Sequence, residues 1–311
     1  MFRNVRFYRV SSPWPETEAA LSALLAKCSF VPVGPLADKR SGWESPTGQL
    51  PREGAELSYC RRVGGADLLR LRTQSRLLPA AAINEALETR IAEFRERMQE
   101  EPSRRQLRRL KEETRDELLP KALTKSERID GFYLHADKLL GIDAASVSKA
   151  ERFIDLLRAT LEGFEFTPLA FSQPIGDLLN SVFLGEQVPG LTIGSECRMQ
   201  DLSEEKATAN WRNTNLADNT VRQHVIDGMK LTHLGMEYNE LLSFVLAEDG
   251  AISKLSFPAT DPADVSDEED PLALQDASFV LLTGTLRELI QSLHKQLGGY
   301  ATVAAEHADA A

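Results

Sequence analysis

Three prolines divide the middle of this sequence into two helical segments, and this feature constrains the fold most. After Pro79, apolar residues recur every three or four positions, which is the period of an amphipathic helix. Pro102 ends or kinks that helix, because a proline ring clashes with the preceding turn. The stretch that follows has the same period, begins with the capping-box spacing of Ser103 and Gln106, and closes at Pro120. Two helices joined by so short a connection form a helical hairpin, and we assign it to residues 76–125.

The segments on both sides of this hairpin alternate between apolar and polar residues, as strands do. Residues 57–63 and 68–73 suit a β-hairpin that turns at Gly64. Residues 128–136 and 139–142 suit a second one. Helices inserted between strands predict an α+β fold with mixed or antiparallel sheets.

The length of 311 residues suits about two domains, with two or three acceptable. We expect a central α+β domain made of residues 1–75 together with 126–170. The helical tip at 76–125 is inserted into it, and residues 171–311 form a C-terminal α+β base domain. Residues 34–56 are rich in Gly, Pro and Ser and predict a long loop.

Several classes of protein do not fit the composition. No apolar run approaches the roughly 20 residues that cross a bilayer, so we expect no membrane partner. Cys28, Cys60 and Cys197 are far apart and odd in number, which predicts a reducing, cytoplasmic environment. Ser195 lacks the second glycine of a nucleophile elbow. We expect no catalytic residue, no metal site and no cofactor.

The charge of the chain is unevenly distributed. The net charge is −11, but residues 240–311 alone hold 13 acidic against 3 basic residues. An acidic loop is expected at residues 258–276. By contrast, residues 61–128 hold 17 basic against 12 acidic residues. An acidic protein can therefore still have a local positive surface that attracts a polyanion.

The second helix of the hairpin has the most informative charge pattern. At 100° per residue, four basic residues fall within an arc of about 60°. This basic stripe consists of Arg104, Arg108, Lys111 and Arg115. We expect the acids of the helix on its far side, namely Glu112, Glu113, Asp116 and Glu117. The basic surface is widened by Arg105, Arg109, Lys121 and Lys125. The stripe is either an ordinary solvated face or a surface that follows a nucleic-acid backbone.

An ordered set of short segments resembles the RdgC family of proteobacterial recombination-associated proteins. These segments are Gly42-Trp43 with Pro46 and Gly48, Leu77-Leu78-Pro79, and residues 83–91, 118–122, 148–151, 199–205, 282–284, 289–290 and 297–299. No single segment is a strong motif, but the ordered set is specific. It covers nearly the whole chain.

The resemblance implies a homodimer that closes into a ring through two different self-contacts. It implies a positively charged bore that binds double-stranded DNA with little sequence preference. It also implies restraint of RecA-promoted strand exchange, association with the nucleoid, and no enzymatic activity.

The resemblance extends to a few single residues. Arg76, Arg97 and Gln200 match family positions expected to face DNA, and Arg198 lies close to the last of these. The apolar residues Leu118, Leu119 and Leu123 are expected in a self-contact. Two positions depart from the family pattern: Leu123 replaces a phenylalanine, and Met199 replaces a basic residue.

Two other functions remain open on the sequence. The first is a metal-dependent DNA-processing enzyme that uses the C-terminal acids, among them Asp267, Glu268, Glu269 and Asp270. The second is an inhibitor that binds RecA and not DNA.

Overall fold

The computed structural model describes residues 2–48, 57–201, 207–258 and 270–301, and their strands form one 12-stranded sheet. The strand order is β2-β4-β5-β6-β1-β12-β11-β10-β8-β9, with β3 paired to β4 and β7 to β1. The ladders between these strands are antiparallel. The expected α+β class is confirmed.

The bounds of the elements are as follows. The strands are β1 (Asn4–Val10), β2 (Lys39–Glu44), β3 (Cys60–Val63), β4 (Ala66–Leu77), β5 (Leu123–Leu134), β6 (Leu139–Ile142), β7 (Phe166–Pro168), β8 (Leu191–Gln200), β9 (Thr208–Trp211), β10 (Lys230–Tyr238), β11 (Leu242–Ala247) and β12 (Ile252–Ser256). The helices are α1 (Glu18–Ala26), α2 (Ala80–Met98), α3 (Arg104–Leu118), the 3₁₀ turn η1 (Leu119–Lys121), α4 (Val147–Thr160), α5 (Ile175–Leu184), α6 (Asn219–Ile226) and α7 (Pro271–Gln296). None of the described helices has the length and apolar composition that a membrane span requires.

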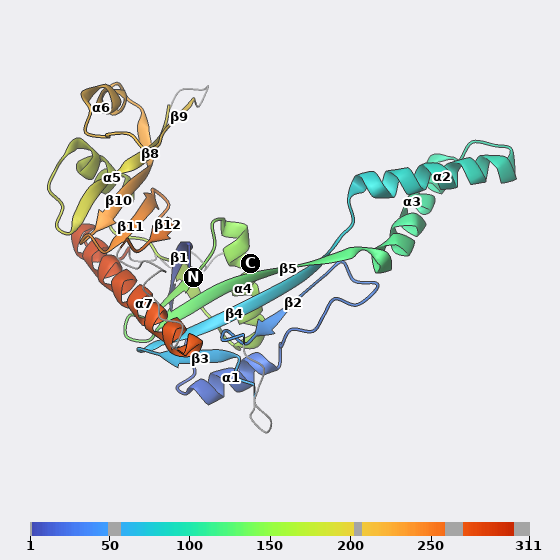
Figure 1. Cartoon of the computed structure of the whole chain (residues 1–311), viewed down its shortest axis with the longest axis horizontal. Helices are drawn as coiled ribbons and strands as arrows, with labels where there is room; N and C mark the ends of the chain where they lie inside the picture. The colour runs from blue at the N-terminus through green and yellow to red at the C-terminus, as the bar shows by residue number, and fades with distance from the viewer. Residues whose placement is uncertain (1, 49–56, 202–206, 259–269, 302–311) are drawn as a thin grey trace, which may run out of the picture.

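The strands β4 and β5 form a ribbon that carries α2 and α3 away from the rest of the chain (Figure 1). Their pairing is continuous over 12 residues of each strand. Ser103 begins α3 with the expected capping box, in which its hydroxyl accepts from the Gln106 amide and the Gln106 side chain accepts from the Ser103 amide at 2.8 Å. The helical hairpin is confirmed. Its return strand starts earlier than expected, however, so Lys125 lies on β5.

The region around Trp43 is a strand and not the loop that its composition predicts. A Cβ atom at Gly42 would lie 2.4 Å from the Phe30 Cα atom, so this glycine marks two backbones packed closely together. The Trp43 side chain is fully buried, and its indole donates to the Thr160 hydroxyl at 2.8 Å. Residues 49–56 of the expected loop lie outside the described residues.

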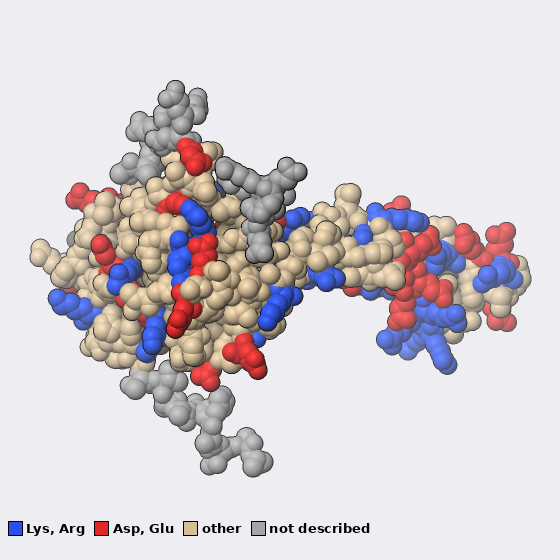
Figure 2. Space-filling view, turned by 90° about the horizontal axis from the view of Figure 1, so that it is seen from below, with Lys and Arg blue, Asp and Glu red and all other residues tan. Residues whose placement is uncertain are grey.

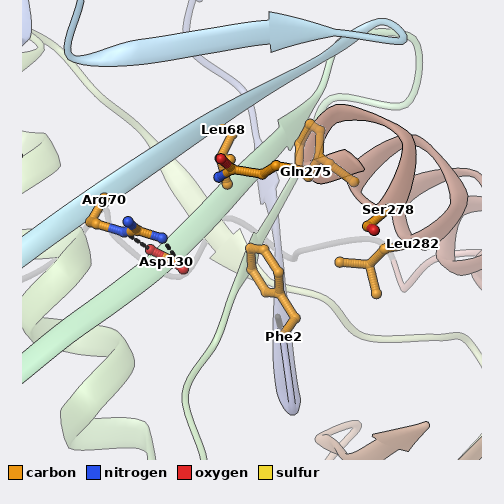
Figure 3. Close-up of a pocket in the computed structure, with 8 residues that line it drawn as sticks. Phe2, Leu68, Arg70, Asp130, Gln275, Ser278 and Leu282 are labelled. Carbon is orange, nitrogen blue, oxygen red and sulfur yellow. Dashed lines mark hydrogen bonds and ion pairs between the residues drawn. The ribbon is translucent and has the colours of Figure 1, made fainter. Parts of the chain in front are cut away.

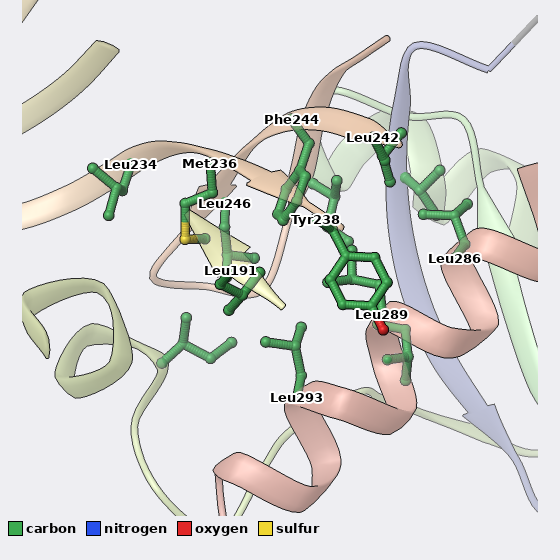
Figure 4. Packing of buried hydrophobic residues seen from close by; sticks show 14 of the residues in the cluster. Leu191, Leu234, Met236, Tyr238, Leu242, Phe244, Leu246, Leu286, Leu289 and Leu293 are labelled. Carbon is green, nitrogen blue, oxygen red and sulfur yellow. The ribbon is translucent and has the colours of Figure 1, made fainter. Parts of the chain in front are cut away.

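The C-terminal half packs α5 and α7 against one face of β8, β10 and β11. Figure 4 shows Leu289 of α7 next to Tyr238 of β10, and Leu293 next to Leu191 of β8. All four side chains are at most 7% exposed. Burying each leucine stabilises the fold by about 1.5–3 kcal/mol.

The helix α7 begins earlier than the acidic composition predicts. Asp270 is its N-cap and accepts from the Leu272 amide at 3.1 Å, and Pro271 occupies the first turn. Proline is favoured there because the amide it lacks would have no helical partner. Residues 271–276 are therefore helical, and 259–269 lie outside the described residues.

The described part of the chain has the shape of a crescent (Figure 1). In Figure 1 the strands β8–β12 lie at one end, the α2–α3 hairpin at the other, and the β4–β5 ribbon between them. The strand β1 joins the two halves of the sheet, since it pairs with β6 on one side and β12 on the other. The domain limits assigned from the sequence stay a prediction.

Candidate nucleic-acid interface

All four residues of the basic stripe are exposed on α3. Two of them have partners. The Arg108 Nε atom lies 3.2 Å from Glu112 Oε1, and Arg115 forms an ion pair with Asp38. Arg104 and Lys111 have no ion pair within the described part of the chain. The stripe therefore contains both free and partly neutralised cations.

We predicted that the acidic residues of α3 lie on the side of the helix away from the basic stripe. This prediction is wrong for Glu112. A residue four positions along a helix lies on nearly the same face, so Glu112 reaches Arg108. Glu113 reaches Arg109 at 2.8 Å in the same way, and Glu117 accepts from Lys121 at 3.2 Å. Figure 2 shows acidic and basic side chains side by side on the hairpin. Exposed pairs of this kind stabilise a helix by only about 0.3–0.5 kcal/mol, so a phosphate group can displace them.

Two other predicted cations, Arg97 and Lys125, lie far apart. Arg97 is exposed near the end of α2, at the tip of the hairpin, whereas Lys125 is exposed where β5 leaves it. Neither has an ion pair among the described residues. The hairpin thus offers cations along its length rather than one compact cluster.

Arg76, which the resemblance expects to face DNA, contacts backbone carbonyl groups of its own chain. Its Nη1 atom donates to the carbonyl oxygens of Leu119, Pro120 and Ala122 at 3.0–3.1 Å. Its Nε and Nη2 atoms donate to the Gly34 carbonyl at 3.3 and 3.2 Å. A cation is favoured here because carbonyl dipoles converge at the end of a helix. Arg76 therefore ties the end of the helical hairpin to the ribbon and to the loop before β2.

The three leucines expected in a self-contact are not equally accessible. Leu119 is 3% exposed and packs within its own chain. Leu118 is half-buried. Leu123 is 77% exposed and lies directly opposite Leu77, which is 48% exposed. Of the three, only Leu123 offers a largely exposed apolar side chain to a partner, and it does so together with Leu77 where the hairpin joins the ribbon.

A second basic surface lies on the face of β8–β12 that α5 does not cover. Arg198 is exposed there, and the half-buried Gln200 follows two positions later on the same strand face. In Figure 1, α5 lies on the side of this sheet that faces away from the β4–β5 ribbon. The open face therefore turns toward the side on which the ribbon and the α2–α3 hairpin extend. Met199 between these two residues is fully buried on the other face. A basic residue would not fit there without leaving the core.

Three residues of this open face escaped sequence reasoning. Arg212, His233 and Lys254 line the same hollow as Arg198. His233 lies on β10 and Lys254 on β12, whereas Arg212 directly follows β9, so only the pairing of these strands brings them together. The available signal was the alternation of β10, which puts His233 on the face opposite Leu234.

The arginines of the ribbon itself hold the strands together. Arg70 on β4 forms a bidentate ion pair with Asp130 on β5. Its Nε atom donates to Oδ1 at 2.6 Å, and its Nη2 atom donates to Oδ2 at 2.9 Å. Burial alone would raise the pKa of Glu44, but Arg128 and Arg72 bind its carboxylate and lower that pKa below the usual value. Figure 3 shows the Arg70–Asp130 pair beside a cavity of about 230 Å³ that is otherwise mostly apolar. These cations are largely neutralised within the chain.

No group of three His, Cys, Asp or Glu side chains is arranged for a metal ion in the part of the chain that the structure describes. Asp267, Glu268 and Glu269 lie outside that part. Burial and nearby acids raise the pKa of the Cys60 thiol to about 12 and that of Cys197 to about 11. Neither is a nucleophile near neutral pH, since the thiolate is the reactive form.

These features define an α+β protein that carries a two-helix hairpin at the end of a long two-stranded ribbon, with exposed cations at both ends of a crescent. The family model described as "Putative exonuclease, RdgC" matches residues 1–300. The chain therefore belongs to the RdgC family, as its short segments indicated.

Curated relatives agree over almost the full length. The chain is 34% identical over 304 residues to "Recombination-associated protein RdgC" of Cupriavidus pinatubonensis, covering 96% of this chain and 98% of the relative. It is 31% identical over 297 residues to the protein of that name from Stenotrophomonas maltophilia, covering 94% and 97%. It is 30% identical over 302 residues to the one from Edwardsiella ictaluri, covering 96% and 98%.

Proposed function

We propose that this protein is a non-sequence-specific double-stranded DNA-binding protein that acts as a ring-shaped homodimer and restrains RecA-dependent recombination. It acts in the cytoplasm at the nucleoid, and contributes there to the repair of replication forks. The observation that carries the proposal is the pair of exposed basic surfaces at the two ends of a crescent. One is the stripe on α3, and the other is the open face of β8–β12. Membership of a family whose curated relatives are recombination-associated supports the same function.

The proposal predicts little discrimination between DNA sequences. The exposed cations of both surfaces can contact phosphate groups, which carry no sequence information. Affinities for unrelated duplexes of equal length are expected to agree within about tenfold, far below the roughly 10³-fold or greater preference of specific binders. Competition measurements with scrambled duplexes test this. One duplex bound a thousandfold more tightly than its scrambled version would contradict the proposal.

The family description as an exonuclease favours a second candidate function, a metal-dependent nuclease. The two are separated by incubating linear and circular duplex DNA with the protein and Mg²⁺. We expect the DNA to remain intact. Degradation that a chelator abolishes would establish the nuclease instead. An inhibitor that binds only RecA would leave the duplex mobility unchanged at low salt, yet would still slow strand exchange.

Self-association gives a further prediction. Light scattering is expected to show a dimer of about 69 kDa, twice the 34.5 kDa mass of the chain. Changing Leu77 and Leu123 to Ser removes an exposed apolar pair that a self-contact would bury, and should shift the population toward the monomer. Ile226→Ser is the matched control, because Ile226 is 67% exposed on α6. A monomeric wild-type protein at micromolar concentration would overturn the dimer.

A further inference from the structure

A row of polar side chains crosses the open face of the C-terminal sheet at His233. The ladders place Asn210 of β9 opposite Arg198 of β8, and Arg198 opposite His233 of β10. Residues directly opposite each other in neighbouring strands share one face of the sheet. A hollow of about 190 Å³ opens over this row, and Arg212 and Lys254 also line it.

The charges around this hollow leave two guanidinium groups without an ion pair. Lys254 is paired with Glu196, which shares the hollow. Two further ion pairs lie nearby: Arg6 with Asp249 at 3.0 Å, and Lys230 with Glu248 at 2.6 Å. By contrast, Arg198 and Arg212 are exposed and form no ion pair among the described residues. The hollow therefore has an excess of positive charge suited to an anion.

The imidazole of His233 is the titratable group in this row. It is half-buried, and its Nδ1 atom lies 3.1 Å from the Thr232 hydroxyl. Its Nε2 atom has no hydrogen-bond partner within the described residues. Burial and the charge of Arg198 lower the pKa of His233 below its usual value, whereas Asp249 and Glu248 oppose that shift. The lowered pKa favours the neutral imidazole in the free protein.

We propose that the hollow binds a phosphodiester group of DNA between Arg198, Arg212 and His233, and that His233 takes up a proton as the group enters. The proposal rests on the DNA-binding function above and adds a regulation to it. A negative phosphate at hydrogen-bond distance favours the charged form of an imidazole. The added proton allows Nε2 to donate to a phosphate oxygen while Nδ1 keeps its contact with Thr232.

The sign of the pH dependence follows from this coupling. Phosphate binding raises the pKa of His233 above its value in the free protein. The extra affinity is then fully present below the free-state pKa and is lost as the pH rises through the bound-state pKa. Because the free-state pKa lies below the usual histidine value, DNA should bind more tightly as the pH falls from about 8 to about 6. A rise of one pKa unit on binding corresponds to about tenfold in affinity.

The test measures the binding of a short fluorescent duplex by anisotropy at constant salt across this pH range. Wild-type affinity is expected to rise by roughly threefold to tenfold. His233→Gln should bind with an affinity that changes little with pH, and calorimetry in two buffers of different ionisation enthalpy should show that it has lost the proton uptake. His233→Asn is a second variant, because its amide stays beside Thr232 if the glutamine disturbs the strand.

His224→Gln is the matched control. His224 is exposed on α6, and its ring centroid lies 5.0 Å from that of Trp211. Trp211 also borders the hollow, but it lies opposite the buried Cys197 and packs against the core, so His224 is not in the row of Asn210, Arg198 and His233. This control should keep the wild-type pH profile. Identical profiles for wild type and His233→Gln would overturn the inference while leaving DNA binding intact. Absence of duplex binding at low salt and every pH would instead overturn the proposed function itself.

Discussion

Changing Arg104 and Lys111 to Ala is expected to flatten the salt dependence of duplex binding. These two residues are the members of the α3 stripe without an ion pair among the described residues. Each phosphate contact releases condensed counterions, so removing one such contact should reduce the slope of log K against log salt by about 0.9. The double variant should therefore lose up to about two units of slope and bind every sequence more weakly. The helix should remain folded, because alanine is the better helix former.

The partner pair on the same stripe supplies the first comparison. Arg108 and Arg115 are already neutralised in part by Glu112 and Asp38. Their charge is therefore less available to a phosphate, so changing both to Ala should flatten the slope by less than the first pair does. Changing Glu112 to Ala should act in the opposite direction and tighten binding, because it frees Arg108.

Lys27 and Lys295 supply the cation control. Both are exposed, and both lie outside the hairpin and outside the open face of the C-terminal sheet. Their replacement by Ala removes the same charge and should leave the slope nearly unchanged. If the Arg104 and Lys111 variant binds like wild type across salt, the stripe is a solvated face. The DNA surface would then be sought at Arg198 and Arg212.

The helical hairpin could be predicted in detail because its signals are local. Proline positions, apolar periodicity and the Ser103–Gln106 spacing each act within a few residues. The turn at Gly64 and the strands on either side of it were predictable for the same reason. Such features depend little on the rest of the fold, so a single sequence reveals them.

The strand at Trp43 and the hollow at His233 depend on contacts between distant segments. Gly42 resembles a loop residue, yet it is required because the backbone at Phe30 packs against it. Arg198, His233 and Lys254 come from three different strands, and Arg212 directly follows a fourth, so only the pairing of these strands brings them to one hollow. The composition of a chain does not reveal which residues of two paired strands lie opposite each other. For the same reason, Arg76 could be singled out from the sequence, but the four carbonyl groups that accept its hydrogen bonds could not be predicted.

The largest effect on the arrangement of the hairpin is expected from Arg76→Ala. The variant removes the donor shared by the carbonyls of Gly34, Leu119, Pro120 and Ala122. Hydrogen bonds that involve a charged group contribute about 1.5–3 kcal/mol each to stability. The peptide containing η1 should therefore exchange its amide hydrogens at least about tenfold faster, since local opening controls exchange there. Hydrogen-exchange mass spectrometry measures this on the intact protein.

Duplex binding by the same variant distinguishes a structural tie from a phosphate contact. If Arg76 ties the hairpin to the ribbon, its loss should weaken binding with little change in the salt slope. If Arg76 contacts a phosphate, as the family resemblance implies, the slope should fall by about 0.9 while exchange at η1 stays as in wild type. Arg40→Ala is the matched control, because Arg40 is exposed on the adjacent strand and pairs with Gln74, two residues before Arg76. The control should leave exchange at η1 unchanged. Wild-type exchange in Arg76→Ala would show that the converging carbonyls do not need this arginine to hold the hairpin in place.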